Sequence, residues 1–243
     1  KKEYLFLFGF FACTFLAVTP GLYFRPHYFL LWVPALSLLA GVGFEILTSG
    51  FSSSKVKTTI SVVILALVLG LPVLIQKRIL FTMPVNEVTR MIYGLNPFSE
   101  SLEIAQYIRD YTIKEDKVVV LGSEPQIYFY SQRKSATRHL YMYPLMEKHV
   151  YARKMQDEMI REIEGAQPKF VVMAKTAGTW VSTRPDFSPA LKDWAQGYLN
   201  REYEIDGVVD LFPHKETIYR WGNQAQEYMP QSTHHLILYK RRT

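Results

Sequence analysis

Three long stretches without a charged side chain lie in the first third of the chain. They cover residues 4–24, 26–44 and 58–76, and each has close to the about 20 residues that a helix needs to cross the hydrocarbon core of a bilayer. Buried helices of a large soluble protein are the alternative, but three such runs so close together would need an unusually large apolar shell. We therefore predict three transmembrane helices, at about residues 4–24, 27–47 and 58–77.

Most charged residues follow this apolar region. Residues 1–80 contain nine Lys, Arg, Asp and Glu side chains, and the rest of the chain contains 41, an ordinary density for a soluble domain. The net charge of the whole chain is +6, but nearly all of the positive excess belongs to the apolar region. Nucleic-acid binding is therefore not predicted. The single cysteine, Cys13, excludes an internal disulfide bond.

Basic residues at the ends of the apolar stretches predict an orientation. By the positive-inside rule, the side of the bilayer with more Lys and Arg faces the cytoplasm. The count favours an extracytoplasmic C-terminal part, with Lys1, Lys2, Lys55 and Lys57 on one side and Arg25, Lys77 and Arg78 on the other. No initiator Met precedes Lys1, so we expect the sequence to begin inside a longer chain.

The charged part of the chain has the pattern of an α/β domain. Residues 81–97 are rich in turn signals and are predicted to be a linker. Apolar residues at helical spacing predict helices around residues 102–108, 152–163 and 191–198. Apolar and alternating runs predict strands at residues 118–121, 170–174, 203–212, 217–221 and 235–240. The expected fold of residues 98–243 is a soluble three-layer α/β domain with a mainly parallel sheet.

No motif for a nucleotide or a metal occurs in the sequence. GxGxxG, GxxxxGK[ST] and HExxH are missing, and one cysteine cannot form a cysteine-based zinc site. His234 and His235 are adjacent on a predicted strand, so their side chains should point to opposite faces, which argues against a shared metal. The sequence therefore identifies no catalytic residue, no metal ligand and no cofactor.

Residues 122–144 depart from a simple core pattern. The segment starts at the carboxyl end of the predicted strand 118–121, and such ends form the edge at which open α/β sheets bind ligands. Tyr, Arg, Glu and Gln side chains can stack on a sugar ring and hydrogen-bond its hydroxyls. The candidate substrate-binding residues are Glu124, Gln126, Tyr128, Tyr130, Arg133 and Arg138. In the structural alternative, Tyr128 belongs to the core and the arginines to a solvated or lipid-facing surface.

The turn between the first two predicted spans carries a second candidate site. Residues 19–28 place Arg25 and His27 beside aromatic side chains at the boundary of the bilayer. The planar guanidinium of Arg25 can donate two parallel hydrogen bonds to a phosphate, and the aromatic rings can cover the start of a lipid tail. In the alternative interpretation these residues are an interfacial anchor and nothing more.

Four short motifs resemble a known family. They are Arg25-Pro26-His27-Tyr28 with the apolar run that follows, Asn96-Pro97-Phe98-Ser99-Glu100, the segment 122–130 and the segment 133–137. Between about residues 23 and 143 the chain resembles bacterial protein O-mannosyltransferase-like glycosyltransferases. These membrane enzymes of the GT-C type are related to the dolichyl-phosphate-mannose protein mannosyltransferases and to the aminoarabinose transferase of lipid A.

The resemblance implies a multi-pass enzyme of the bacterial inner membrane, with the C-terminal domain periplasmic or extracellular. The enzyme would transfer a sugar from a polyprenyl-phosphate donor to a glycan, lipid or protein acceptor, and Arg25, His27 and Tyr28 would bind the donor phosphate. In the family an acidic residue of the first extracytoplasmic loop is the general base. Residues 1–80 hold only Glu3 and Glu45 as acids, neither in such a loop, so the resemblance implies a C-terminal fragment that contains no catalytic residue. Whether a full-length enzyme uses a divalent metal is left open.

Two other functions agree with the same sequence. One is a non-enzymatic, membrane-anchored module whose α/β domain binds or assembles a partner of the cell envelope. The other is a lipid-linked oligosaccharide ligase or polymerase, which uses a lipid-phosphate donor but transfers a preassembled glycan. The bilayer is a partner in each of these interpretations.

Overall fold

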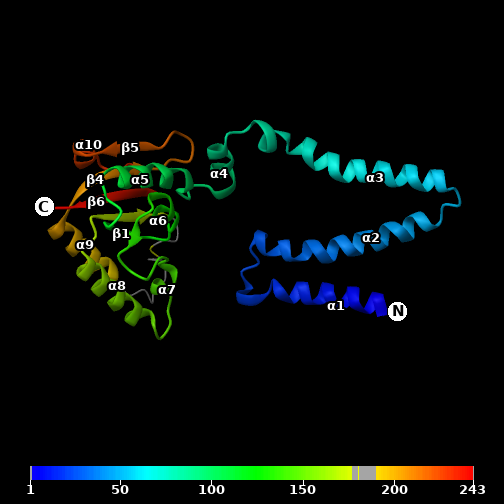
Figure 1. Cartoon of the computed structure of the whole chain (residues 1–243), viewed down its shortest axis with the longest axis horizontal. Coiled ribbons are helices and arrows are strands. Elements are labelled where there is room, and N and C mark those ends of the chain that lie inside the picture. Colours follow the sequence, from blue (N-terminus) through cyan, green and yellow to red (C-terminus); the bar gives the residue numbers. More distant parts are fainter. Residues whose placement is uncertain (1, 177–179, 181–189, 243) are drawn as a thin grey trace. The chain divides into compact units, whose positions relative to one another are not determined.

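The computed structural model describes residues 2–176, 180 and 190–242. The chain divides into two compact units, Lys1–Thr82 and Met83–Thr243, and Figure 1 draws both. Lys1, which contributes to the predicted orientation, lies outside the described residues.

The first unit is helical. Its α-helices are α1 (Lys2–Ala17), α2 (Val33–Ser49) and α3 (Ser54–Ile75). The turns η1 (Pro20–Leu22) and η2 (Pro26–Trp32) are 3₁₀-helical and connect α1 to α2, and the π-helical turn η3 (Arg78–Thr82) follows α3. Within the described part of the chain, two helical segments are long and apolar enough to cross a membrane, Pro26–Ser49 and Ser54–Ile75.

The first predicted span is shorter than expected. The sequence predicts a helix over residues 4–24, but α1 ends at Ala17 after 16 residues. Pro20 has no backbone N–H to continue the helix, and Gly21 adopts a φ of 78°, outside the helical region. At about 1.5 Å per residue α1 is about 24 Å long, less than the about 30 Å of a hydrocarbon core. By length and composition, two of the three predicted spans are supported.

The outer surface of these helices is apolar. No residue of α3 is buried, and Ile75 at its end is 78% exposed. A helix in the core of a soluble protein would have its apolar side chains covered by the protein itself. Inside the unit the ring centroid of Trp32 lies 5.7 Å from that of Phe11 and 5.6 Å from that of Phe15. A soluble core therefore does not explain α2 and α3.

The second unit is built on a sheet that has six strands among the described residues. In chain order they are β1 (Lys117–Leu121), β2 (Lys134–Ser135), β3 (Phe170–Lys175), β4 (Tyr203–Asp210), β5 (Ile218–Trp221) and β6 (His235–Arg241). Across the sheet the order is β2-β1-β3-β6-β4-β5. The predicted strands coincide with β1, β3, β4, β5 and β6, while the short β2 was not predicted.

The sheet is mixed, which corrects the predicted mainly parallel sheet. β1 pairs in parallel with β2 and β3, but β6 is antiparallel to β3 and β4, and β4 is antiparallel to β5. A parallel pair needs a crossover of about a dozen or more residues, usually a helix. Only residues 211–217 join β4 to β5, so these two strands can pair only as antiparallel neighbours. The chain then returns as β6 between β3 and β4.

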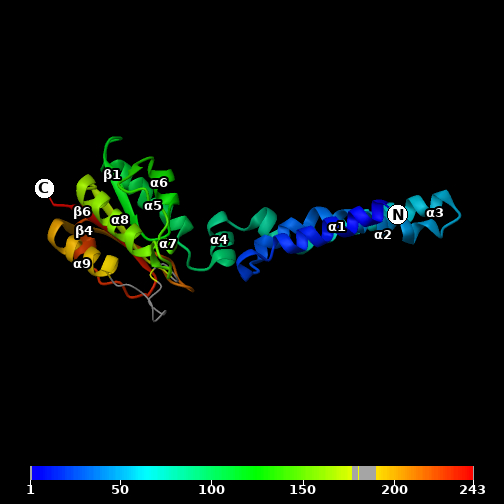
Figure 2. The same cartoon turned by 90° about the horizontal axis from the view of Figure 1, so that it is seen from below.

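Helices cover both faces of the sheet. The helices of the second unit among the described residues are α4 (Val85–Tyr93), α5 (Phe98–Asp110), α6 (Gln126–Ser131), α7 (Tyr143–Met146), α8 (Ala152–Ala166), α9 (Ala190–Glu202) and α10 (Asn223–Gln226). Alternate residues of β1 point to opposite faces, with Val119 in a core shared with α8 and α9 and Val120 in a core shared with α5 and α6. Figure 2 shows these two helix pairs on opposite sides of the sheet.

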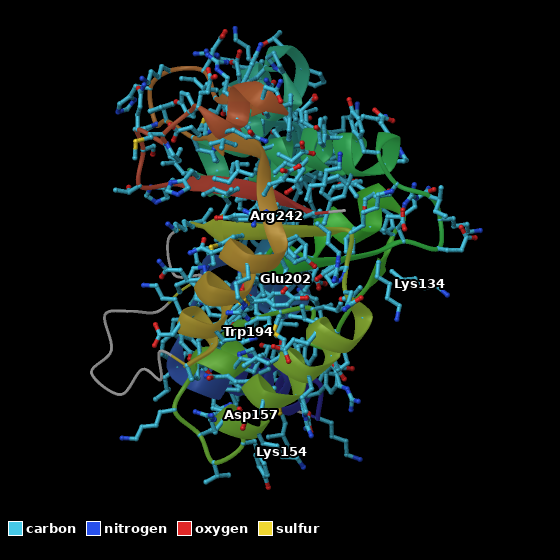
Figure 3. The ribbon with its side chains drawn as sticks, turned by 90° about the vertical axis from the view of Figure 1, so that its left-hand side faces the viewer. Lys134, Lys154, Asp157, Trp194, Glu202 and Arg242 are labelled. Atoms are coloured by element: carbon cyan, nitrogen blue, oxygen red, sulfur yellow. The ribbon has the colours of Figure 1, made fainter. Side chains whose placement is uncertain are left out.

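α8 and α9 lie side by side over one face of the sheet (Figure 3). Trp194 of α9 donates a hydrogen bond from Nε1 to Oε1 of Glu164 on α8 at 2.8 Å. At the end of α9 the carbonyl of Glu202 accepts a hydrogen bond from the N–H of Arg242 at 2.9 Å. These contacts connect the two covering helices with each other and with the strand β6 beneath them.

The predicted linker, residues 81–97, contains the helix α4. Val85, Val88 and Ile92 have helical spacing, Pro84 precedes the first turn, and Gly94 ends the helix with a φ of 60°. The turn signals at residues 83–84 and 94–97 therefore mark the two ends of a helix and not a structureless connection. α4 belongs to the second unit.

Candidate functional site

The carboxyl ends of β1, β3 and β4 lie at one edge of the sheet. β1 and β3 are parallel, and β4 runs in the same direction as β3 because both are antiparallel to β6. Lys175 at the end of β3 and Asp210 at the end of β4 both pair with His235 at the start of β6. The loops 122–125, 211–217 and 232–234 therefore share this edge. Ligands of α/β sheets bind at such an edge.

Glu124 is a buried acid at this edge. Gln126 Nε2 donates to its Oε2 at 2.8 Å, and Thr176 Oγ1 donates to its Oε1 at 3.3 Å. Gln126 Nε2 also donates to Oγ of Ser101 at 3.0 Å, which connects the site to the start of α5. Burial raises the pKa of Glu124, and the hydrogen bonds from Gln126 and Thr176 oppose that rise. A carboxyl group with a raised pKa is suited to exchange a proton with a ligand.

A small cavity of about 200 Å³ opens beside Thr176. Its other lining residues are Met173, Lys175, Trp180, Lys192 and Thr233. The indole of Trp180 donates from Nε1 to the carbonyl of Ala174 at 2.8 Å, which holds the ring against the end of β3. The cavity is smaller than the about 300–1,000 Å³ of ordinary ligand pockets. It can hold a small polar group and not a whole sugar substrate.

A larger cavity lies between α4, the start of α5 and the loop 211–217. Its volume is about 580 Å³, within the about 300–1,000 Å³ that ligand pockets occupy. It is lined by Asn86, Glu87, Arg90, Ser99, Glu100, residues 212–217 and Tyr219, and we call it the α4 groove. Its place at the carboxyl edge makes the α4 groove the main candidate binding site of the second unit.

Glu100 is the central polar group of the α4 groove. Its side chain is only 2% exposed, forms an ion pair with Arg90 and accepts a hydrogen bond from Oγ1 of Thr217 at 2.7 Å. Arg90 also donates to the carbonyl of Gly94 at 3.0 Å. The second carboxylate oxygen, Oε2, is buried and has no hydrogen-bond partner among the described residues. Buried carboxylate oxygens are ordinarily paired, so Oε2 is an acceptor in the wall of the groove that the described residues leave without a donor.

Aromatic rings and a further cation surround Glu100. The ammonium of Lys215 lies 3.7 Å from the ring centroid of Phe212. Burial raises the pKa of Tyr219, and the negative charges of Glu100 and Glu103 raise it further, so its phenol keeps its proton. The described residues contain no group of three or more side chains that could hold a metal ion. The groove thus offers an acceptor, cationic donors and ring faces, which suits a ligand rich in hydroxyl groups.

The predicted substrate-binding residues do not form one site. Glu124 and Gln126 lie together at the carboxyl edge, as described. Tyr128 belongs to the core, where its Oη accepts a hydrogen bond from the N–H of Val120 at 2.7 Å and burial raises its pKa. Tyr130 lies on the exposed side of α6, and its carbonyl accepts a hydrogen bond from Arg109. Only the first two can act together on one ligand.

The two predicted arginines have structural partners elsewhere. Arg133 donates to the carbonyls of Arg109 at 3.2 Å and Thr112 at 2.8 Å, so it caps the last turn of α5. That end of the 13-residue helix is about 20 Å from the end that carries Glu100. Arg138 pairs with Glu162 of α8 at 2.6 Å. Both sets of contacts agree with the alternative interpretation, in which these arginines are surface residues and not part of a binding site.

Arg25, His27 and Tyr28 share one turn of the first unit. The N–H of Tyr28 donates to the carbonyl of Arg25 at 2.9 Å, and the rings of His27 and Tyr28 meet edge to face at 4.7 Å. The guanidinium carbon of Arg25 lies 5.5 Å from the ring centroid of Tyr23. Arg25 and His27 are exposed, and Tyr28 is half-buried. The side chain of Arg25 forms no ion pair with a described residue, so its donors remain available for an anion.

Sequence reasoning misses Arg90, Glu100 and Thr217 as site residues. Arg90 falls within the predicted linker and lies 127 residues before Thr217, so no local pattern relates the two. One signal is present in the sequence. Glu100 ends the motif Asn96–Glu100 and lies in the first turn of α5, immediately after the turn that Pro97 produces.

Comparisons with other proteins add no further identification. No protein-family model matches the sequence, and no curated protein matches it. The family resemblance therefore remains a prediction from the four motifs. The functional argument depends on the α4 groove, on Glu124 and on the apolar helices of the first unit.

Proposed function

We propose that the chain is the C-terminal part of an integral membrane glycosyltransferase that uses a polyprenyl-phosphate sugar and an acceptor outside the cytoplasm. The first unit contributes three spans in a bacterial inner membrane, and the second unit is a periplasmic or extracellular domain that binds a glycan in the α4 groove. The observation that carries this proposal is the buried carboxylate of Glu100, with one oxygen paired to Arg90 and the other without a partner. Catalysis is assigned to another part of the full-length enzyme.

The chemistry of the α4 groove favours a glycan. Neighbouring hydroxyls of a sugar each donate and accept, so one can donate to the carboxylate of Glu100 while the next accepts from a cationic side chain. Phe212 and Tyr219 provide ring faces for the C–H side of a sugar. A ligand without the hydroxyl would leave Oε2 of Glu100 unpaired, and such a loss is costly in a buried site.

Two features of the first unit support membrane insertion and donor binding. The apolar side chains of α1, such as Leu5 and Phe8, are exposed like those of α2 and α3, so α1 together with η1 is proposed as a third span. The free guanidinium of Arg25, beside His27 and Tyr28, can hold the phosphate of the donor. The family resemblance supports the same role for these three residues.

A membrane-anchored binding module is the second candidate function. It is favoured by the arrangement in the α4 groove, where Glu100 and Arg90 are already paired with each other. Such a pair can orient a ligand but is not poised for nucleophilic or acid–base chemistry. In this alternative the second unit holds a glycan of the cell envelope and the chain transfers nothing.

Glu100→Gln tests the α4 groove. The substitution keeps the volume of the side chain but costs a charged hydrogen bond to the ligand, worth about 1.5–3 kcal/mol. We expect the detergent-purified chain to bind methyl glycosides at least about tenfold more weakly, measured by saturation-transfer NMR titration. Glu103→Gln, on the exposed side of the same helix, is the matched control and should leave binding unchanged. Equal binding by both variants and the unaltered chain would show that the α4 groove is not the glycan-binding site.

Arg25→Ala in the full-length enzyme tests donor binding and separates the two functions. We expect a higher KM for the polyprenyl-phosphate sugar, because the phosphate loses a bidentate partner. Arg78→Ala, a basic residue after α3, is the control. An unchanged KM for the polyprenyl-phosphate sugar would show that Arg25 does not bind the donor. Absence of any sugar transfer by the full-length protein, with glycan binding intact, would favour the binding module.

A further inference from the structure

α4 is an amphipathic helix whose polar side faces its own domain. Asn86, Glu87 and Arg90 line the α4 groove, and Arg90 is paired with Glu100 of α5. A helix on the surface of a soluble domain ordinarily does the reverse, with its apolar side against the core and its polar side in water. Of these three side chains, Arg90 is half-buried and held by Glu100, while Asn86 and Glu87 line the groove and remain exposed.

The apolar side of α4 is exposed. Val85 and Ile92 are seven residues apart, so they lie on the same side of the helix, and they are 82% and 58% exposed. Met91 is exposed as well, and Val88, on the same side as Val85 and Ile92, is half-buried. Tyr93 lies on the side of Asn86, where its ring meets that of Phe98 edge to face at 5.0 Å. A continuous apolar surface of this kind on a soluble protein ordinarily marks a contact with a partner or a membrane.

The chain before α4 indicates what covers this side. The apolar helix α3 ends at Ile75, so even a fully extended link would keep Val85 within about 36 Å of that end. Part of the link is the η3 turn, which shortens the reach further. The link also carries Lys77 and Arg78, which anionic head groups attract, and an exposed Phe81. A bilayer that contains α3 is therefore within reach of α4.

From this geometry we infer that α4 lies in the head-group region of the bilayer. Val85 and Ile92 rest against the acyl boundary, and Arg90 is turned to the groove. This inference rests on the proposed membrane insertion of α3.

Spin labels on the full chain test the inference. In a Cys13→Ser background, the variants Ile92→Cys, Asn86→Cys and Leu69→Cys receive a nitroxide one at a time, and the chain is reconstituted in phosphatidylcholine–phosphatidylglycerol vesicles. Oxygen concentrates in the bilayer, whereas a nickel chelate stays in water. We expect the oxygen-to-nickel collision ratio to be several-fold higher for the label of Ile92→Cys than for that of Asn86→Cys. Ile92 is exposed, so the label does not disturb the core.

The three positions give separable outcomes. Leu69, 62% exposed on α3, reports membrane insertion, and Asn86 is the matched position on the polar side of α4. If the label of Leu69→Cys is in lipid but those of Ile92→Cys and Asn86→Cys meet nickel equally, the interfacial helix is wrong and the membrane anchor stands. A label of Ile92→Cys shielded from both reagents would indicate a protein contact and would also overturn the inference. If the label of Leu69→Cys meets nickel, the membrane anchor fails, and the proposed function fails with it.

Discussion

Gly207 allows a quantitative test of packing beneath the candidate site. It lies on β4 directly opposite Trp221 of β5, and a Cβ atom at this position would be 2.5 Å from Cζ3 of Trp221 and 3.0 Å from Cβ of Leu238. Carbon atoms in ordinary contact are about 3.5–4.0 Å apart. The indole of Trp221 is also stacked on Tyr107, with ring centroids 4.3 Å apart. Gly207→Ala must therefore displace the indole of Trp221. This movement would disturb either its stacking on Tyr107 or the position of the edge strand β5.

The expected cost follows from this overlap. Overpacking of this kind costs about 1–3 kcal/mol, and the smaller conformational entropy of Ala in the unfolded chain offsets about 0.4–1 kcal/mol. We expect Gly207→Ala to lower the free energy of unfolding by about 1–2 kcal/mol. For a domain of this size the melting temperature should fall by roughly 2–8 °C.

Tryptophan fluorescence during thermal unfolding in detergent measures the effect, and Trp221 is itself a reporter. Gly165→Ala in α8 is the matched control, because apart from the neighbouring backbone of its own helix no atom lies within 4 Å of the place that its Cβ would take. In a helix, Ala is favoured over Gly by up to about 1 kcal/mol, so this control should melt at the same or a higher temperature. A Gly207→Ala variant that melts no lower than Gly165→Ala would refute the close approach of Trp221.

Two further predictions concern the carboxyl edge. Asp210 is fully buried and accepts hydrogen bonds from Tyr228 Oη at 2.9 Å, Gln231 N at 2.7 Å and Ser232 N at 3.1 Å. Asp210→Asn should therefore lower the free energy of unfolding, measured by denaturant titration, by about 2–3 kcal/mol. Tyr228→Phe removes only one of these bonds and should cost about 1 kcal/mol, and an equal cost for both would contradict the network. Glu124 has a pKa raised by burial, so its contribution to stability is greatest at low pH and is lost as pH rises through its folded-state pKa. Glu124→Gln should therefore raise the melting temperature relative to the unaltered chain at pH 7 but not at pH 4, and the same difference at both pH values would show that Glu124 is not desolvated.

Much of the second unit follows from local sequence pattern. The runs 118–121 and 170–174 form β1 and β3, and the spacing of Leu191, Ala195 and Tyr198 gives the buried side of α9. The mixed pairing could not be predicted in the same way, because a strand has the same side-chain pattern whether its neighbour is parallel or antiparallel. The direction depends on the connection, and here the short loop 211–217 requires an antiparallel pair.

The candidate site was predicted only in part. Glu124 follows a buried strand, so its place at the carboxyl edge could be inferred, and the structure puts it there with Gln126. Arg133 and Arg138 look like ligand-binding arginines in the sequence, but both have structural partners in the fold. Arg133 donates to the carbonyl of Thr112 at the end of α5, and Arg138 pairs with Glu162 of α8. Arg90 could not be found, because its role depends on Glu100 and on Thr217, which is 127 residues away.

The sequence by itself determined the division between an apolar helical part and a charged α/β part, because runs without charge and the periodicity of apolar side chains are local properties. It also determined where β1, β3 and α9 form. Only the tertiary structure decided that the sheet is mixed and that Arg90 of α4 lies in a groove beside Glu100 and Thr217. The physical reason is that strand direction, burial and ion pairing depend on partners distant in the chain, and only the folded chain brings such partners together.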